Sequence, residues 1–266
     1  MVVFSPTGTG RTVAERVVSG FATENDVVRL CELTVAEAGR GTGEMTIGGV
    51  GVFVAPVYGG RVAETAVERF GRVRAAEPGK TPAVLIVVYG NRDYEDALLE
   101  LRDLVVRQGF VPLSGGAFVG EHSYSRPREG MPIAAGRPDE ADCAVAERFG
   151  AESRTKYDGW NNGAGGVDEL SVPGKRPYKV KGPSTPATPT TCAERCTGCG
   201  ACVEACPIGV VTLAADGRAV SSAEGCIKCC ACLKCCPADA RQFDTPYTER
   251  LFLNFSARRE PELFLL

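Results

Sequence analysis

The chain has 266 residues, 44% of them hydrophobic and 24% charged, with a formal net charge of −3 and one histidine. This length accommodates one large or two small domains. No apolar run approaches the roughly eighteen residues of a membrane span, and the N-terminus lacks the basic region of a signal peptide. Because the chain also has no basic tract, we expect no nucleic-acid binding and no membrane span, and we expect a cytoplasmic location.

Residues 1–155 alternate short apolar runs with amphipathic segments. The apolar runs are bounded by Gly, Pro or Asn, which predicts five buried strands: Met1–Phe4, Val27–Leu33, Val50–Val57, Ala83–Val88 and Gly116–Val119. Between them, apolar residues at helical spacing predict four helices: Arg11–Phe21, Val62–Val73, Asp93–Arg107 and Pro138–Arg154. Strands that alternate with helices indicate an α/β fold with a parallel sheet covered on both faces.

A turn rich in hydroxyl groups and glycines joins the first predicted strand to the first helix. Its candidate binding residues are Ser5, Thr7, Gly8, Thr9, Gly10, Arg11 and Thr12. Backbone N–H groups at a helix N-terminus bind anions, so we expect a phosphate site there. An ordinary helix cap rich in Ser and Thr is the alternative interpretation.

Three further loops follow predicted strands, at the edge where open α/β sheets bind ligands. The first two supply the candidates Pro56, Val57, Tyr58, Gly59, Gly60, Tyr89, Gly90, Asn91, Arg92 and Tyr94. A flat ring needs an aromatic stacking partner, and Tyr58 and Tyr94 are the candidates. The third loop, 120–125, holds the single histidine, His122, and whether it lies near the ligand stays open.

The remaining chain divides into three parts. Residues 156–190 are rich in Asn, Gly and Pro, which predicts a linker. Residues 191–245 contain most of the cysteines, and the apolar tail 246–266 is expected to pack back onto a domain.

Two cysteine runs form an internal repeat within residues 191–245. Cys196–Pro207 and Cys226–Pro237 both have the spacing C-x₂-C-x₂-C-x₃-C-P. This is the bacterial ferredoxin run, in which three cysteines hold one [4Fe–4S] cube and the fourth ligates the other. We therefore expect one cluster on Cys196, Cys199, Cys202 and Cys236, and a second on Cys226, Cys229, Cys232 and Cys206.

Other uses of the cysteines fit less well. A disulfide framework needs an exported chain, and a zinc ribbon uses two C-x₂-C pairs rather than two four-cysteine runs. Cys192, Cys230 and Cys235 are left over, and we interpret them as small residues beside the clusters. Cys31 and Cys143 are expected in the core.

Taken together, these motifs resemble the flavodoxin–ferredoxin fusion proteins of anaerobic microbes. The resemblance rests on the Ser5–Thr12 turn, on PVYGGR, YGNRDYEDALLEL, GEHSYS, GRPDEAD and VPGKRPYK, and on both cysteine runs. Gly10 stands where the flavodoxin phosphate loop has its last threonine. The resemblance implies a flavodoxin-like, doubly wound, five-stranded parallel sheet of order 2-1-3-4-5 with FMN at its switch point. A ferredoxin-like α+β domain with two [4Fe–4S] clusters would follow.

We therefore expect an oxygen-sensitive electron carrier that passes electrons between a donor protein and an acceptor protein through FMN and two clusters. One alternative is an FMN-dependent reductase of a small molecule, with His122 or Tyr124 as proton donor. Another is a redox-sensing interaction module. No catalytic residue is assigned, and whether the chain forms a homo-oligomer is left open.

Overall fold

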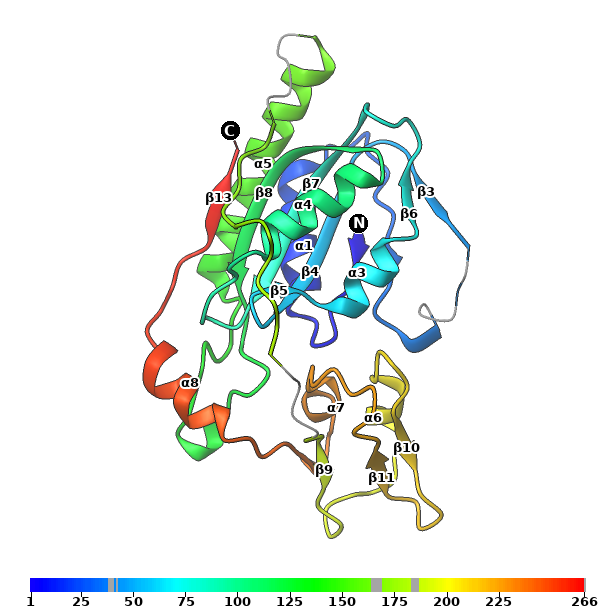
Figure 1. Ribbon diagram of the computed structural model, residues 1–266, viewed down its shortest axis with the longest axis vertical. Coiled ribbons are helices and arrows are strands. Elements are labelled where there is room, and N and C mark those ends of the chain that lie inside the picture. Colours follow the sequence, from blue (N-terminus) through cyan, green and yellow to red (C-terminus); the bar gives the residue numbers. More distant parts are fainter. Residues whose placement is uncertain (38–40, 42, 164–168, 183–186, 266) are drawn as a thin grey trace.

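The computed structural model describes residues 1–37, 41, 43–163, 169–182 and 187–265. An α/β domain lies above a smaller cysteine-rich domain (Figure 1). The chain passes from the first domain to the second and then returns, since its C-terminal strand lies beside the sheet of the first domain (Figure 1). None of the helices in the described ranges is both long and apolar enough to cross a membrane.

A mostly parallel sheet of seven strands forms the centre of the α/β domain, in the order β13-β8-β7-β4-β1-β2 with β5 paired to β4. Its parallel strands are β1 (Val2–Val3), β2 (Cys31–Glu32), β4 (Gly51–Tyr58), β7 (Thr81–Tyr89) and β8 (Phe110–Val119). Two antiparallel strands, β5 (Arg61–Val62) and β13 (Glu262–Phe264), were not expected. The sheet is therefore larger than the predicted five strands, because the C-terminal tail extends it.

The prediction of a buried strand over Val27–Leu33 is wrong for most of that segment. Only Cys31 and Glu32 pair with β1, while the Val27 side chain is 82% exposed. Near this edge, β3 (Met45–Ile47) and β6 (Val73–Ala75) form a separate parallel pair that the sequence analysis did not identify.

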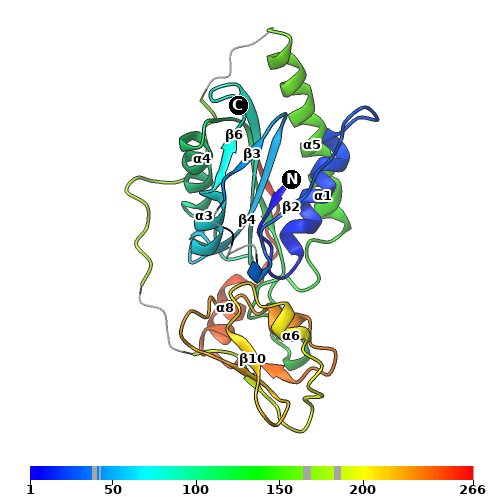
Figure 2. The same cartoon turned by 90° about the vertical axis from the view of Figure 1, so that its right-hand side faces the viewer.

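Two pairs of helices cover the two faces of the sheet (Figure 2). The pairs are α1 (Thr9–Phe21) with α5 (Glu140–Asn161), and α3 (Glu64–Phe70) with α4 (Ala97–Arg107). Two glycines allow α1 and α5 to touch: a Cβ at Gly20 would lie 1.9 Å from the Glu147 carbonyl oxygen, and one at Gly150 would lie 2.0 Å from that of Val17. The expected helices are present, although α3 is shorter than Val62–Val73 and α5 continues past Arg154.

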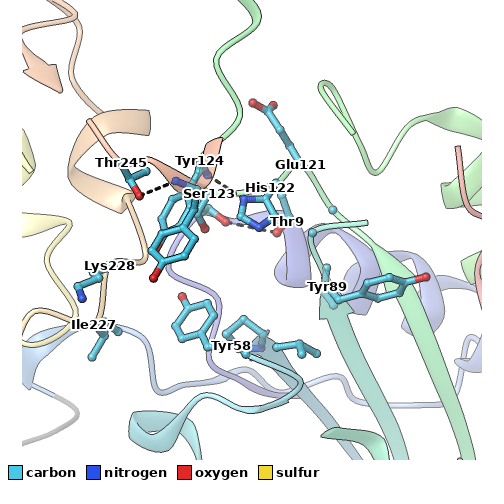
Figure 3. Close-up of a pocket in the computed structure, with 18 of the residues that line it drawn as sticks. Thr9, Tyr58, Tyr89, Glu121, His122, Ser123, Tyr124, Ile227, Lys228 and Thr245 are labelled. Carbon is cyan, nitrogen blue, oxygen red and sulfur yellow. Dashed lines mark hydrogen bonds between the residues drawn. The ribbon is translucent and has the colours of Figure 1, made fainter. Parts of the chain in front are cut away.

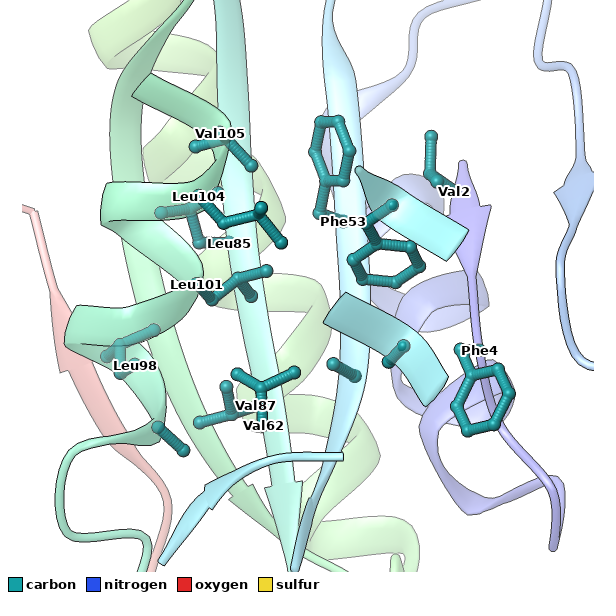
Figure 4. Close-up of a cluster of buried hydrophobic side chains, with 14 of the residues drawn as sticks. Val2, Phe4, Phe53, Val62, Leu85, Val87, Leu98, Leu101, Leu104 and Val105 are labelled. Carbon is teal, nitrogen blue, oxygen red and sulfur yellow. The ribbon is translucent and has the colours of Figure 1, made fainter. Parts of the chain in front are cut away.

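The core lies on both faces of β7, whose nine residues are all buried. On one face Leu85 and Val87 pack beneath Leu98 and Leu101 of α4 (Figure 4). On the other face Val84 and Ile86 belong to a second apolar cluster that includes residues of α1 and α5. A strand that is buried on both sides reads as a continuous apolar run, which explains why the sequence predicts β7 well.

The cysteine-rich domain repeats one local pattern twice. Each cysteine run contains a one-turn helix, α6 (Ala201–Glu204) or α7 (Ala231–Lys234), and each is followed by a short strand. The strands form two antiparallel pairs: β10 (Val211–Leu213) with β11 (Ala219–Ser221), and β9 (Thr190–Thr191) with β12 (Arg241–Gln242). The helix α8 (Tyr247–Phe255) then leads back towards β13.

The segment between the domains is attached to the first one over its described residues 169–182. Asp96 accepts hydrogen bonds from the backbone N–H groups of Lys175 and Lys179 at 2.8 and 2.7 Å. Asp103 pairs with Arg176 at 2.6 Å. The expected linker is therefore a strap along α4 in this part, while residues 164–168 and 183–186 lie outside the described residues.

The two domains also contact each other directly. Lys234 of α7 forms an ion pair with Glu121, and Arg126, in the 3₁₀ region around Pro127–Glu129, pairs with Asp244 at 3.0 Å. The Thr248 hydroxyl of α8 donates to the Tyr124 carbonyl oxygen at 3.2 Å. The domains are thus docked around the loop that follows β8.

Candidate functional site

The turn after β1 has the geometry expected of an anion site. Gly8 caps α1 with a left-handed φ of 83°, and the Ser5 hydroxyl accepts from the Arg11 N–H at 3.1 Å. Thr7 and Thr9 line a cavity at this helix N-terminus, with their hydroxyls 3.3 Å apart. The other candidates, Ser5, Gly8, Gly10, Arg11 and Thr12, shape the turn without lining the cavity. The Arg11 side chain instead pairs with Glu15 at 2.8 Å.

The loop after β4 supplies four of its five predicted residues to the same cavity: Pro56, Val57, Tyr58 and Gly59. Gly60 does not line it but packs against Glu95, whose Oε2 would lie 2.0 Å from a Cβ at this position. Burial raises the pKa of the half-buried Tyr58, and the nearby thiols of Cys229 and Cys230 add to that rise. Tyr58 therefore lines the cavity and lies near the second cysteine run.

The loop after β7 departs from the prediction. Tyr89 and Gly90 line the cavity, but Asn91, Arg92 and Tyr94 do not. Asn91 donates to the carbonyl oxygens of Phe255 and Ala257, and the Tyr94 hydroxyl bonds Glu262 at 2.8 Å. The Arg92 carbonyl accepts from Arg259 at 2.6 Å. These three residues hold the returning C-terminal segment, so Tyr94 is not placed to stack on a ligand in this cavity.

The loop after β8 brings His122 to the cavity wall. The imidazole packs on Gly90, where a Cβ would lie 2.4 Å from its Cδ2. The Tyr124 N–H donates to Nδ1 at 3.0 Å, which leaves the proton of the neutral ring on Nε2. Burial above all, then the charges of Arg92 and Lys234, lower the pKa of His122 to about 4. His122 is therefore neutral near pH 7.

These loops enclose a cavity of about 440 Å³ between the two domains (Figure 3). Tyr58 and Tyr124 lie on its wall, while the Tyr89 side chain points away (Figure 3). Eight further lining residues were not predicted from the sequence and come from the strap, the cysteine-rich domain and the segment after it: Lys179, Lys181, Gly182, Ile227, Lys228, Phe243, Thr245 and Tyr247.

The chemistry of this interdomain cavity suits a flat aromatic ligand with an anionic group. Its volume lies within the range of small-molecule sites. The N-terminus of α1, with the hydroxyls of Thr7 and Thr9, favours an anion at one side. The rings of Tyr58 and Tyr124 offer aromatic surface beside it.

Two smaller cavities lie inside the cysteine-rich domain, and each is lined by one predicted set of four cysteines. Cys196, Cys199, Cys202 and Cys236 line the first, and Cys206, Cys226, Cys229 and Cys232 line the second. The fourth cysteine of each run thus faces the cavity of the other run. We call these the first and second cysteine cavities.

The loops that carry the cysteines need left-handed backbone at equivalent positions. In the first run Gly198 and Gly200 have φ values of 70° and 80°. In the second run Lys228 and Cys230 adopt φ values of 56° and 60° at the same places. Glycine takes this conformation freely, whereas other residues pay about 1–2 kcal/mol. The second run therefore has a strained backbone at Lys228 and Cys230, and both residues line the second cysteine cavity.

None of the thirteen cysteines, all of which lie within the described residues, forms a disulfide. Within the described residues, no group of three or more His, Cys, Asp or Glu side chains converges closely enough to hold a single metal ion. A cube differs from a single ion because its four thiolates bind four separate irons, so they surround a space rather than converge on a point. Both cysteine cavities have that arrangement.

The remaining cysteines do not line the first cavity. The Cys235 thiol donates to the Ala201 carbonyl oxygen at 3.5 Å, and the Cys192 thiol to Glu194 at 3.1 Å. Cys230 is buried beside the second cavity. Cys143 is buried in α5, and Cys31 lies in β2 against Met45.

Comparison with known proteins bears on the second domain. Residues 195–241 match the family model of the 4Fe-4S dicluster domain, and this range includes all eight predicted ligands. Comparison with curated proteins found no match to the chain. The cysteine-rich domain is therefore a ferredoxin-like 4Fe-4S dicluster domain, and such a domain implies iron–sulfur electron transfer with redox partners.

Proposed function

We propose that the chain is an electron-transfer protein that holds FMN in the interdomain cavity and two [4Fe–4S] clusters in the dicluster domain, and that it exchanges electrons with protein partners. The observation that carries this proposal is that Ile227 and Lys228 line both the interdomain cavity and the second cysteine cavity. When bound, the clusters supply single electrons and FMN accepts or releases one or two.

The topology of the α/β domain supports the flavodoxin-like part of the proposal. The chain places β2 on one side of β1 and β4 on the other, so the strand order reverses between β1 and β4. Ligands of open α/β sheets bind at such a switch point, outside the carboxyl ends of the strands. Thr7 and Thr9 after β1, and Tyr58 after β4, line the cavity there.

Each group of residues has its own task in this arrangement. Thr7, Thr9 and the N-terminus of α1 would hold the FMN phosphate. Tyr58 would contact the ring, and the backbone of Gly59 and Gly90 would approach it closely. The two cysteine sets would hold the clusters, the second of them next to the flavin. The docked strap and α8 would help keep water from the ring.

The test is to prepare the protein anaerobically, reconstitute it with iron, sulfide and FMN, and measure the content of each. We expect about eight irons and one FMN per chain, and bleaching of the flavin absorbance when the clusters are reduced. Fewer than two clusters, an empty flavin site, or a flavin that reduced clusters never bleach would each overturn the proposal.

Two matched cysteine variants test the ligand sets. Cys199→Ala should lose the first cluster and keep FMN, because Cys199 lines only the first cysteine cavity. Cys143→Ala should keep all of its iron, because Cys143 lies in α5 of the other domain. If iron stayed near eight per chain in Cys199→Ala, the ligand assignment would be wrong.

A reductase of small molecules is the second candidate, favoured by the presence of His122 and Tyr124 on the cavity wall. His122 is a weak proton donor near pH 7, because its pKa is lowered to about 4 and the ring is neutral. The pKa of Tyr124 is raised by burial and by the thiols of Cys230 and Cys226, so that hydroxyl keeps its proton. Turnover of a small molecule without any protein acceptor would favour this candidate over the carrier.

A further inference from the structure

The two halves of the dicluster domain differ at one buried position. Val211 stands five residues after Cys206, and Arg241 stands five residues after Cys236, so the two are equivalent in the repeat. Each begins a strand and is 3% exposed. Val211 lines the second cysteine cavity and Arg241 lines the first. The repeat therefore replaces an apolar side chain with a guanidinium at the cavity wall.

The Arg241 side chain reaches both cysteine cavities. Its Nη2 donates to the thiol sulfur of Cys232, which belongs to the second set, at 3.8 Å, and to the Pro189 carbonyl oxygen at 3.2 Å. Further bonds go to the hydroxyls of Thr191 and Ser221. Its Nε is buried and has no hydrogen-bond partner in the part of the chain that the structure describes. The Arg241 guanidinium thus contacts Cys232 of the second cysteine set and also lines the first cysteine cavity. Its Nε remains available as a hydrogen-bond donor.

This buried charge has no carboxylate partner within the described residues, where the ion pairs found do not include Arg241. An isolated buried cation is strongly destabilising unless an anion compensates its charge. The anions that would lie near Arg241 are the cysteine thiolates of the two ligand sets. Arg241 donates to the sulfur of Cys232 and lines the first cysteine cavity together with Cys196 and Cys202.

We propose that Arg241 is a shared counter-charge for the two clusters and raises the reduction potential of both. The proposal rests on the proposed ligand sets. Reduction adds one electron, and therefore one negative charge, to a cluster, and a fixed cation with N–H groups near the sulfurs stabilises that added charge. Arg241 is a positioning residue in this role, since it acts on the clusters through their ligands.

The test is an anaerobic redox titration of the full, reconstituted chain, followed by electron paramagnetic resonance, with iron and sulfide content measured on each sample. Arg241→Val copies the residue that the first half of the repeat carries. We expect both midpoint potentials to fall, by at least a tenfold change in the reduced-to-oxidised ratio at a fixed potential, which is ~59 mV for one electron. Arg241→Lys keeps the charge, so it should recover part of the shift.

The matched control is Arg250→Gln, which removes an exposed arginine on α8, outside the dicluster domain, and should leave both potentials in place because solvent screens it. If Arg241→Val does not hold its clusters, Arg241→Gln decides in the same way, since it keeps N–H donors without the charge. If Arg241→Val or Arg241→Gln holds both clusters and keeps the wild-type midpoint potentials, the proposal that Arg241 is a counter-charge is wrong. A wild-type chain that holds fewer than two clusters would instead overturn the proposed function.

Discussion

Arg69 of α3 donates from Nη2 to the carbonyl oxygen of Pro207 at 2.5 Å, and this bond joins the α/β domain to the residue after Cys206. The guanidinium is buried, and its Nη1 also donates to the carbonyl oxygens of Leu33 and Thr34 at 2.5 and 2.9 Å. One side chain therefore connects the edge of the sheet to the wall of the second cysteine cavity.

Replacing this arginine should affect both stability and electron exchange between the domains. Arg69→Met removes the donors for several carbonyl groups in a buried place, so we expect the free energy of unfolding to fall by about 3 kcal/mol in urea titrations. Flavin bleaching by reduced clusters should also slow in stopped-flow measurements. Arg107→Met, on an exposed part of α4, should change neither quantity. Unchanged bleaching in a destabilised Arg69→Met would show that docking does not depend on this bond.

The cysteine sets could be predicted from the sequence because their ligands are close along the chain and the pattern is repeated. The spacing predicts that Cys206 and Cys236 each serve the opposite cluster, and each lines the cavity of the opposite run. The buried strand β7 was equally accessible, because residues such as Leu85 and Ile86 form an uninterrupted apolar run. For the cysteine sets and for β7, the pattern of residues close in the sequence was sufficient for a correct prediction of which residues lie together.

The missed parts of the site depend on contacts between distant segments. Tyr94 was predicted to stack on the ligand, but its hydroxyl donates a hydrogen bond to Glu262, 168 residues away. Ile227 reaches the interdomain cavity only because the domains dock, and no pattern near it predicts that. Val27 belongs to an apolar run of which only Cys31 and Glu32 join the sheet. Apolar character alone therefore indicated a longer strand than the structure has.

The two tyrosines predicted to stack on the flavin should now behave differently. Tyr58→Ala removes an aromatic wall of the cavity, so we expect FMN to bind several-fold to tenfold more weakly, as an aromatic contact of about 1 kcal/mol requires. Tyr94→Phe should leave FMN affinity unchanged and lower the free energy of unfolding by about 1 kcal/mol, because it loses the bond to Glu262. Fluorescence titration with FMN measures the first quantity and urea unfolding the second. Equal losses of FMN affinity in both variants would contradict the placement of Tyr94.

His122 should make the protein less stable as the pH falls. In the unfolded chain its pKa is the ordinary 6.5, whereas in the folded protein burial lowers it to about 4. Between these values the unfolded state binds more protons, so the free energy of unfolding decreases as pH falls, by up to about 2 kcal/mol from pH 7.5 to pH 5. Denaturant unfolding across this range should show the decrease, and His122→Gln should reduce it by that amount. An equally steep pH dependence in His122→Gln would show that other groups cause it.

Asp96 should control how tightly the strap closes the interdomain cavity. Its two carboxylate oxygens accept the backbone N–H groups of Lys175 and Lys179, and Lys179 and Lys181 line the cavity just beyond. Asp96→Ala leaves both N–H groups without an acceptor, so we expect proteolysis within residues 175–182 and FMN release that is faster by about tenfold, which corresponds to about 1.4 kcal/mol.

Asp158→Asn provides the comparison, because Asp158 pairs only with Arg154 on an exposed surface of α5 within the described residues. This variant should keep the wild-type rate of FMN release in stopped-flow fluorescence. If Asp96→Ala became sensitive to protease while FMN release stayed at the wild-type rate, the strap would be a connection between domains and not a wall of the site. The two measurements together therefore separate attachment of the strap from its contribution to ligand retention.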